Sequence, residues 1–102
     1  NGPLFFAMTD KVMDIVKDTS EDVLILRMRA VPAIDASALH IFYEILDTCK
    51  RAGITLVFSH VNEQPMKMLQ KAGFDKEVGV ENFCPNIDTA LLRAKEIVSA
   101  NK

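Results

Sequence analysis

This 102-residue sequence has no tryptophan, only one tyrosine and no excess of basic residues, with 12 lysines and arginines against 14 aspartates and glutamates. The net charge is −2, and the basic residues form no run. Proteins that bind nucleic acid usually carry a basic face, and those that bind single strands add aromatic side chains for base stacking. We therefore expect no nucleic-acid partner.

Cysteine is scarce as well. The two cysteines, Cys49 and Cys84, stand far apart in the sequence, and the two histidines, His40 and His60, are equally isolated. Zinc sites need cysteine and histidine ligands at short, regular spacing, which this sequence lacks. We expect no metal and no cofactor, and lone cysteines of this kind fit a reduced, cytosolic compartment.

Long hydrophobic runs are absent too. No segment approaches the about 20 apolar residues that a membrane-spanning helix requires. The first residues, Asn1 to Phe6, lack the basic segment that begins a signal peptide. The chain does not begin with methionine, so we interpret residue 1 as a boundary within a longer protein. A length of 102 residues with 49% apolar and 25% charged residues predicts a single globular domain over residues 1–102.

Strand-like and helix-like segments alternate along the chain. Residues 23–28 and 55–61 are nearly continuous apolar runs, as in strands that are covered on both faces. Between them, Leu39, Phe42 and Leu46 recur at helical spacing. The predicted order is a strand fragment at 4–6, helix 9–18, strand 23–28, helix 37–52, strand 55–61, helix 63–72 capped by Asn62, a weak edge strand around Val78, Val80 and Phe83, and a last helix that starts at Pro85-Asn86.

A strand, a helix and a second strand in this order form a βαβ unit, whose strands are parallel and whose crossover is right-handed. The predicted fold class is therefore α/β, with a small, mostly parallel central sheet. About four helices are expected to pack mainly on one face of this sheet, because each has a single apolar stripe. The opposite face is expected to be covered by an upstream segment or to stay partly open.

The stretch from Val31 to Leu39 joins the first buried strand to the long helix. Its Asp35 and Ser37 belong to the residue types that cap helix N-termini, for about 1 kcal/mol, and capping alone is the simplest interpretation. The same position suits a phosphate or another anion, because free N–H groups and the helix dipole favour negative charge there. Asp35 fits both interpretations: it could orient a hydroxyl for a kinase, yet it would repel the phosphate that forms.

Ser37, Asp35 and His40 could be combined on paper into a catalytic triad, but one helical turn does not place a nucleophile, a base and an orienting carboxylate correctly. Nucleophile elbows, Walker loops and dinucleotide fingerprints are absent from the sequence. We therefore expect no enzymatic activity and no catalytic residue. Phe5, Phe6 and His40 are instead candidates for a partner-facing surface, although the two phenylalanines would also suit packing against upstream sequence.

The segment Asp35-Ala36-Ser37-Ala38-Leu39, directly after a buried strand, resembles the STAS domain, a family named for sulfate transporters and anti-sigma factor antagonists. The family pattern at this point is Asp, a small residue, Ser or Thr, Gly or Ala, and Leu. Three further segments resemble the SulP-type anion permeases of this family: Gly-Pro-Leu-Phe-Phe-Ala at 2–7, Val-Pro-Ala-Ile-Asp at 31–35 and Val-Asn-Glu-Gln-Pro at 61–65. The resemblance covers nearly the whole chain and implies a STAS-type fold whose first strand precedes residue 1.

This resemblance implies a cytoplasmic regulatory and protein-interaction domain at the C-terminal end of a bacterial SulP-type transporter of the inner membrane, which would carry sulfate or a related anion. The implied partners are the membrane domain of the parent transporter and cytosolic regulatory proteins. In the anti-sigma antagonist branch the serine at the position of Ser37 is a phosphorylation switch, so a free-standing antagonist is the alternative. Nucleotide binding has been proposed within the family, but no glycine-rich phosphate loop supports it here.

Overall fold

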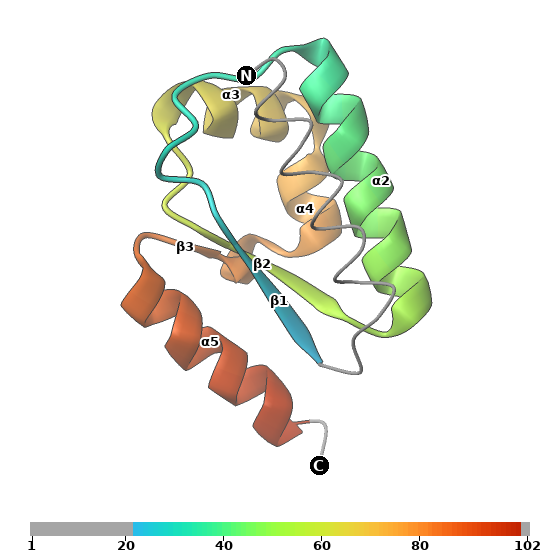
Figure 1. Cartoon of the computed structure of the whole chain (residues 1–102), viewed down its shortest axis with the longest axis vertical. Helices are drawn as coiled ribbons and strands as arrows, with labels where there is room; N and C mark the ends of the chain where they lie inside the picture. Colours follow the sequence, from blue (N-terminus) through green and yellow to red (C-terminus); the bar gives the residue numbers. More distant parts are fainter. Residues whose placement is uncertain (1–21, 101–102) are drawn as a thin grey trace.

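The computed structural model of the protein describes residues 22–100 (Figure 1). A parallel sheet lies at its centre, formed by β1 (Val23–Arg27), β2 (Thr55–Ser59) and β3 (Phe83–Cys84) in the order β1-β2-β3. Arg27 at the end of β1 is in register with Ser59, which in turn is in register with Cys84. The carboxyl ends of the strands therefore meet at one edge of the sheet.

Helices cover both faces of this sheet (Figure 1). The long helix α2 (Ala36–Ala52) lies with α3 (Glu63–Ala72) and the short α4 (Phe74–Val78) on one side, and α5 (Ile87–Ala100) lies on the other. The expected α/β architecture with helices mainly on one face is confirmed. Among the described residues α5 covers the opposite face, which the prediction of an upstream cover or a partly open face did not include.

The side chains of each strand divide between two cores, because successive residues of a strand point to opposite faces. Leu56 and Phe58 of β2 belong to the larger core, which they share with α2, α3 and α4. Val57, between them, belongs to a smaller core with Ala90 and Ile97 of α5. Both Val57 and Phe58 are fully buried, as a central strand covered on both faces requires.

Helix α2 buries Phe42 and Leu46 of the predicted apolar stripe together with Ala38, Ile45 and Cys49, while Leu39 is half-buried. It ends at Gly53, which adopts a left-handed conformation (φ 74°) and donates its backbone N–H to the carbonyl groups of the last turn. Glycine takes this conformation without steric cost, so the predicted stop at residues 52–53 is confirmed. Among the described residues, no helix is long and apolar enough to cross a membrane.

Residues 74–82 do not form the predicted edge strand. Phe74 restarts the chain as helix α4 immediately after Gly73, whose left-handed conformation (φ 80°) ends α3, and the Phe74 ring is fully buried. A 3-10 turn (Val80–Asn82) follows, in which Val80 is 61% exposed. The apolar residues of this segment follow neither the strand period nor the helix period, so the sequence carried no clear signal. The helix that forms here buries the Phe74 ring. Of the three residues predicted to form the edge strand, only Phe83 lies in the observed strand β3.

The other predicted boundaries are close to those observed. Helix α3 spans the predicted residues 63–72, whereas β1 and β2 end one and two residues earlier than predicted, at Arg27 and Ser59. The predicted strand fragment at 4–6 and the predicted helix at 9–18 lie outside the described residues.

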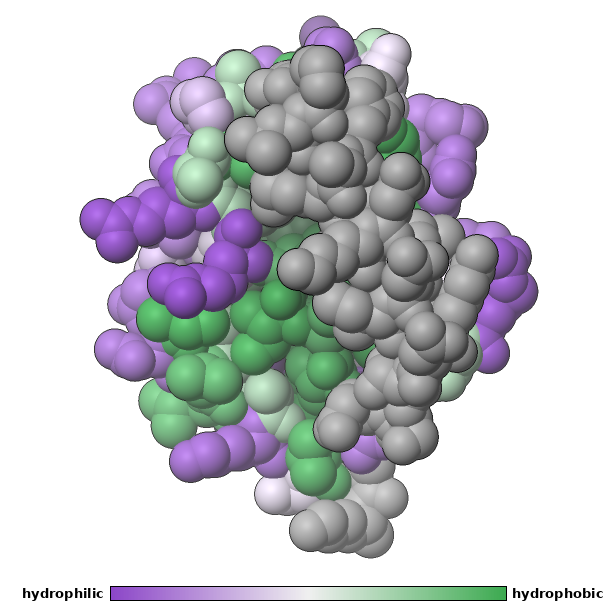
Figure 2. Space-filling view, in the orientation of Figure 1, coloured by the Kyte–Doolittle hydropathy of each residue, from purple (hydrophilic) through white to green (hydrophobic). Residues whose placement is uncertain are grey.

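Arginine and asparagine side chains connect α5 to the segment before β3. Arg93 Nε donates a hydrogen bond to Asn82 Oδ1 (2.8 Å), and Asn82 Nδ2 donates to the carbonyl of Val78 (3.0 Å). Asn82 is buried, so both bonds satisfy groups that would otherwise destabilise the fold. On the outer face of α5, Leu91 and Leu92 stay exposed, and the apolar surface over this helix is visible in Figure 2.

The two cysteines are expected to differ in reactivity. Cys49 is fully buried and burial raises the pKa of its thiol to about 11, so hardly any reactive thiolate forms near pH 8. Burial also raises the pKa of Cys84, but Arg93 opposes this shift and the side chain is only half-buried. In the folded chain iodoacetamide should therefore label Cys84 well before Cys49, as followed by mass spectrometry. Equal labelling rates without denaturant would contradict the structure.

Candidate functional site

The β1–α2 loop, residues 28–35, carries the junction that the sequence singled out. Its first residue, Met28, donates its backbone N–H to the carbonyl of Ser59 (2.9 Å), and Val31 N–H donates to the carbonyl of Met28 (3.0 Å). Val31 and Ile34 are buried, while Pro32 and Ala33 between them are exposed. The loop is thus anchored by two apolar side chains and crosses the surface between them.

Two amide side chains at the start of α3 hold this loop. Asn62 Nδ2 donates to the carbonyls of Arg29 (3.1 Å) and Val31 (2.8 Å). Gln64 makes a two-point contact with Ile34, since its Oε1 accepts the Ile34 N–H (2.8 Å) and its Nε2 donates to the Ile34 carbonyl (3.1 Å). These four bonds satisfy backbone groups that no secondary structure pairs, and they fix the loop relative to α3.

Asn62 therefore has a different role from the predicted one. It occupies the N-cap position of α3, but its side chain makes no capping hydrogen bond there. Its amide is committed to the β1–α2 loop instead. Sequence reasoning missed this role and that of Gln64, although both residues were in the segment 61–65 that carried part of the family resemblance. Nothing in the local sequence tells a capping amide from one that bonds a distant loop.

Asp35 is the cap of α2. Its Oδ1 accepts the backbone N–H of Ala38 (2.9 Å), and its backbone is extended (φ −113°), as is usual for a residue that precedes the first helical turn. The helix starts at Ala36, one residue before the predicted start, so Ser37 lies inside the first turn and is exposed. Within residues 22–100 the Ser37 hydroxyl has no hydrogen-bond partner. The capping role thus belongs to Asp35, which leaves Ser37 accessible.

Removing the Asp35 cap is expected to cause a modest loss of stability that depends on its side-chain oxygen. Asp35→Ala should lower the free energy of unfolding by about 1 kcal/mol, because it removes the oxygen that accepts the Ala38 N–H. Asp35→Asn should retain most of the stability, since asparagine caps about as well. Asp47→Ala on the same helix breaks only a surface pair with Arg51 and should cost less than about 0.5 kcal/mol. Urea unfolding followed by circular dichroism compares the three; equal losses would contradict the cap.

The structure does not assemble a catalytic triad. His40, one turn beyond Ser37, is exposed, and its Nε2 lies 3.2 Å from Glu44 Oε1 on the outer face of α2. No hydrogen bond connects the side chains of Asp35, Ser37 and His40 within the described residues. Phe5 and Phe6, the other candidates for a partner surface, lie outside the described residues. Among residues 22–100 no three His, Cys, Asp or Glu side chains form a group that could hold a metal ion.

A cavity that the sequence did not predict lies at the carboxyl edge of the sheet. It has a volume of about 370 Å³ and follows the ends of β2 and β3, with the lining residues His60, Val61, Met66, Phe83, Cys84 and Pro85. His60 stands out because its φ of 55° is the one positive φ of a non-glycine residue in the described chain. Open α/β sheets commonly bind ligands at such an edge.

Comparisons with known proteins agree with these features. The STAS domain family profile matches residues 1–90. The crystal structure of a sulfate transporter family protein from Wolinella succinogenes is 37% identical and superimposes with a TM-score of 0.83, covering 97% of this chain and 83% of that one. The SulP transporter STAS domain from Vibrio cholerae is 30% identical, with a TM-score of 0.84, over 96% of this chain and 78% of that one. No curated protein matched the sequence.

Proposed function

Because the chain belongs to the STAS domain family, we propose that it is the cytoplasmic regulatory and protein-interaction domain of a SulP-type anion transporter of the inner membrane. Two solved relatives, one a sulfate transporter family protein and the other a SulP transporter STAS domain, support this proposal at 37% and 30% identity over nearly the whole chain. The family is not generally enzymatic, and we propose that this chain has no catalytic activity of its own.

The observation that carries the proposal is that Ser37 is exposed in the first turn of α2, where hydrogen bonds hold the start of the helix and the preceding loop. Asp35 takes over the capping of α2, and Gln64 holds the preceding Ile34 in place. No acidic residue lies in the first turn of α2, so the Asp35 cap is the one carboxylate beside Ser37 at this helix start among the described residues. Phosphorylation of Ser37 would add nearly two negative charges at an accessible point, and the nearby Asp35 cap would direct the new phosphate outward.

The implied partners are the membrane domain of the parent transporter and cytosolic regulatory proteins. His40 lies three residues after Ser37, so the two side chains share one side of α2. The His40 side chain is 79% exposed, although it contacts Glu44. Ser37 and His40 together form the surface on which we expect a partner to sense the phosphorylation state.

A free-standing anti-sigma factor antagonist would use the same serine. The segment Asp35-Ala36-Ser37 suits that role as well, since Ser37 is exposed within residues 22–100. The reading frame upstream of residue 1 separates the two. A region of multiple hydrophobic spans in the same frame supports the transporter, whereas a start codon within about 20 residues, room for one more strand, supports the antagonist.

The regulatory role is tested by deletion in the parent transporter. Residues 1–102 are removed, and anion uptake is measured per transporter molecule in the membrane. Since a separate membrane domain would carry the transport pathway, the truncated protein should still transport, with an altered rate or a lost response to cellular conditions. Uptake and response equal to those of the full-length protein would argue against regulation by this domain.

A further inference from the structure

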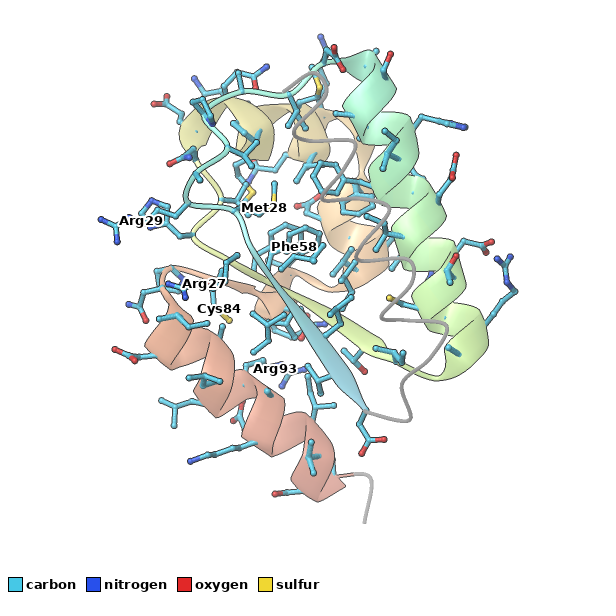
Figure 3. The ribbon with its side chains drawn as sticks, in the orientation of Figure 1. Arg27, Met28, Arg29, Phe58, Cys84 and Arg93 are labelled. Carbon is cyan, nitrogen blue, oxygen red and sulfur yellow. The ribbon has the colours of Figure 1, made fainter. Side chains whose placement is uncertain are left out.

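The outer face of α5 carries an apolar surface that the core of the domain does not use. Leu91 is 49% exposed and Leu92 is 61% exposed, whereas Ala90 of the same helix is fully buried against the sheet. Figure 3 shows Arg93 on the side of α5 that faces the sheet, where its Nε donates to Asn82 Oδ1 (2.8 Å). The two leucines therefore lie on the side of the helix that points away from the domain. Neighbouring exposed apolar side chains on one face are typical of an interaction surface.

Residues of opposite charge flank these leucines at equal spacing. Asp88 precedes Leu91 by three residues, and Lys95 follows Leu92 by three residues. Residues at positions i, i+3, i+4 and i+7 share one face of a helix, so these four form a single stripe, the α5 stripe. All four residues are exposed. The α5 stripe thus carries a negative end, an apolar centre and a positive end.

This order of residues is complementary to itself when two such helices run antiparallel. In an antiparallel pair that is centred between Leu91 and Leu92, Asp88 of each copy lies opposite Lys95 of the other copy, and the leucines meet at the centre. A twofold axis perpendicular to the helices produces this arrangement. A parallel pair would place Asp88 opposite Asp88 and Lys95 opposite Lys95, and like charges in such positions are unfavourable. Charge complementarity therefore selects a second copy of this chain, in the antiparallel orientation.

We propose that the outer face of α5 binds a second copy of this chain through an antiparallel contact between the two α5 stripes. Leu91 also borders a groove of about 360 Å³ with Ala94 and Val98, so the apolar surface extends beyond the two leucines. A contact between single helices is small, and the isolated chain should therefore associate weakly. Helix α5 lies on the other face of the sheet from α2, so the contact does not depend on Ser37 or on the proposed regulation.

The test is sedimentation equilibrium of the 102-residue chain at concentrations up to about 1 mM, the range of weak association. The average mass should rise from 11.4 kDa toward that of a dimer. Leu92→Asp should weaken the association by roughly tenfold or more, because it places a charge in the apolar centre of the contact. Val80→Asp is the matched control, since Val80 is also 61% exposed but lies outside α5. A monomer at every concentration, or equal losses in both variants, would overturn the proposal.

Exchanging the charges tests the antiparallel orientation. Asp88→Lys and Lys95→Asp should each weaken self-association by roughly tenfold, because each variant places like charges opposite one another at both ends of the contact. An equimolar mixture of the two variants should associate more tightly than either variant alone, since every facing pair then joins opposite charges. Both positions are exposed, so folding should be retained and is checked by circular dichroism. A mixture that associates no better than the separate variants would refute the antiparallel contact.

Discussion

Replacing Phe58 with alanine is expected to lower the free energy of unfolding by about 3–5 kcal/mol, the usual cost of removing a buried aromatic ring. Phe58 is fully buried on β2 and contacts aromatic rings from three other parts of the chain. Its centroid lies 5.9 Å from those of Phe42 and Phe74, and 4.8 Å from that of Phe83. Both faces of β2 are covered by helices, so the ring is enclosed within the larger core.

This loss is large beside the total stability of a domain, which is typically about 5–15 kcal/mol. Urea unfolding should show the midpoint of Phe58→Ala far below that of the wild type. Leu92→Ala is the control, since Leu92 is 61% exposed on α5 and its truncation should cost less than about 0.5 kcal/mol. A loss below about 1 kcal/mol for Phe58→Ala would mean that the aromatic cluster is not the centre of the larger core.

Gln64→Leu is expected to cost about 2 kcal/mol and to loosen the β1–α2 loop. The substitution keeps the size of the side chain but leaves both the N–H and the carbonyl of Ile34 without their partner. Ile34 is 3% exposed and both hydrogen bonds are partly buried, so water replaces these bonds incompletely, and an unpaired buried group costs about 1–3 kcal/mol. Since 1.4 kcal/mol is a factor of about ten, hydrogen exchange of the Ile34 amide should accelerate more than tenfold.

Two variants make this measurement specific. Gln70→Leu changes the same residue type on the exposed side of α3 and should leave both stability and Ile34 exchange unchanged. Gln64→Glu can still accept the Ile34 N–H but cannot donate to the carbonyl, so its effect should lie between the wild type and Gln64→Leu. If Ile34 exchanged as slowly in Gln64→Leu as in the wild type, the loop would be held by its apolar anchors alone.

The parts of the fold that sequence reasoning predicted well are those with a strong local period. The buried strands, the wide stripe of α2 and the bounds of α3 all follow from apolar spacing and glycine stops. Helix α4 was missed because its five residues are too few for a helical period, and its formation depends on the Phe74 ring packing against Phe42 and Phe58. Long-range packing of this kind leaves no local signal.

In the candidate site, too, the residues with a local sequence signal were predicted and those that depend on long-range contacts were not. Asp35 and Ser37 were predicted because aspartate and serine are preferred residue types at helix N-termini. Only the structure shows that Asp35 is the cap and that Ser37 is exposed. The amide contacts of Asn62 and Gln64 join residues about 30 positions apart, and the cavity combines residues from the ends of two strands. Such features join residues that are far apart in the sequence, so a local sequence pattern carries no signal for them.

Anion uptake by the parent transporter carrying Ser37→Asp tests the regulatory proposal most directly. Ser37→Ala serves as the unmodified state, and Ser99→Asp, an equal charge at an exposed serine of α5, serves as the matched control. If Ser37 is the switch, Ser37→Asp should change uptake per transporter molecule by about fivefold or more, the lower range of typical coupling, with Ser99→Asp unchanged. Uptake by Ser37→Asp equal to that of Ser37→Ala and Ser99→Asp would contradict a regulatory switch at the start of α2.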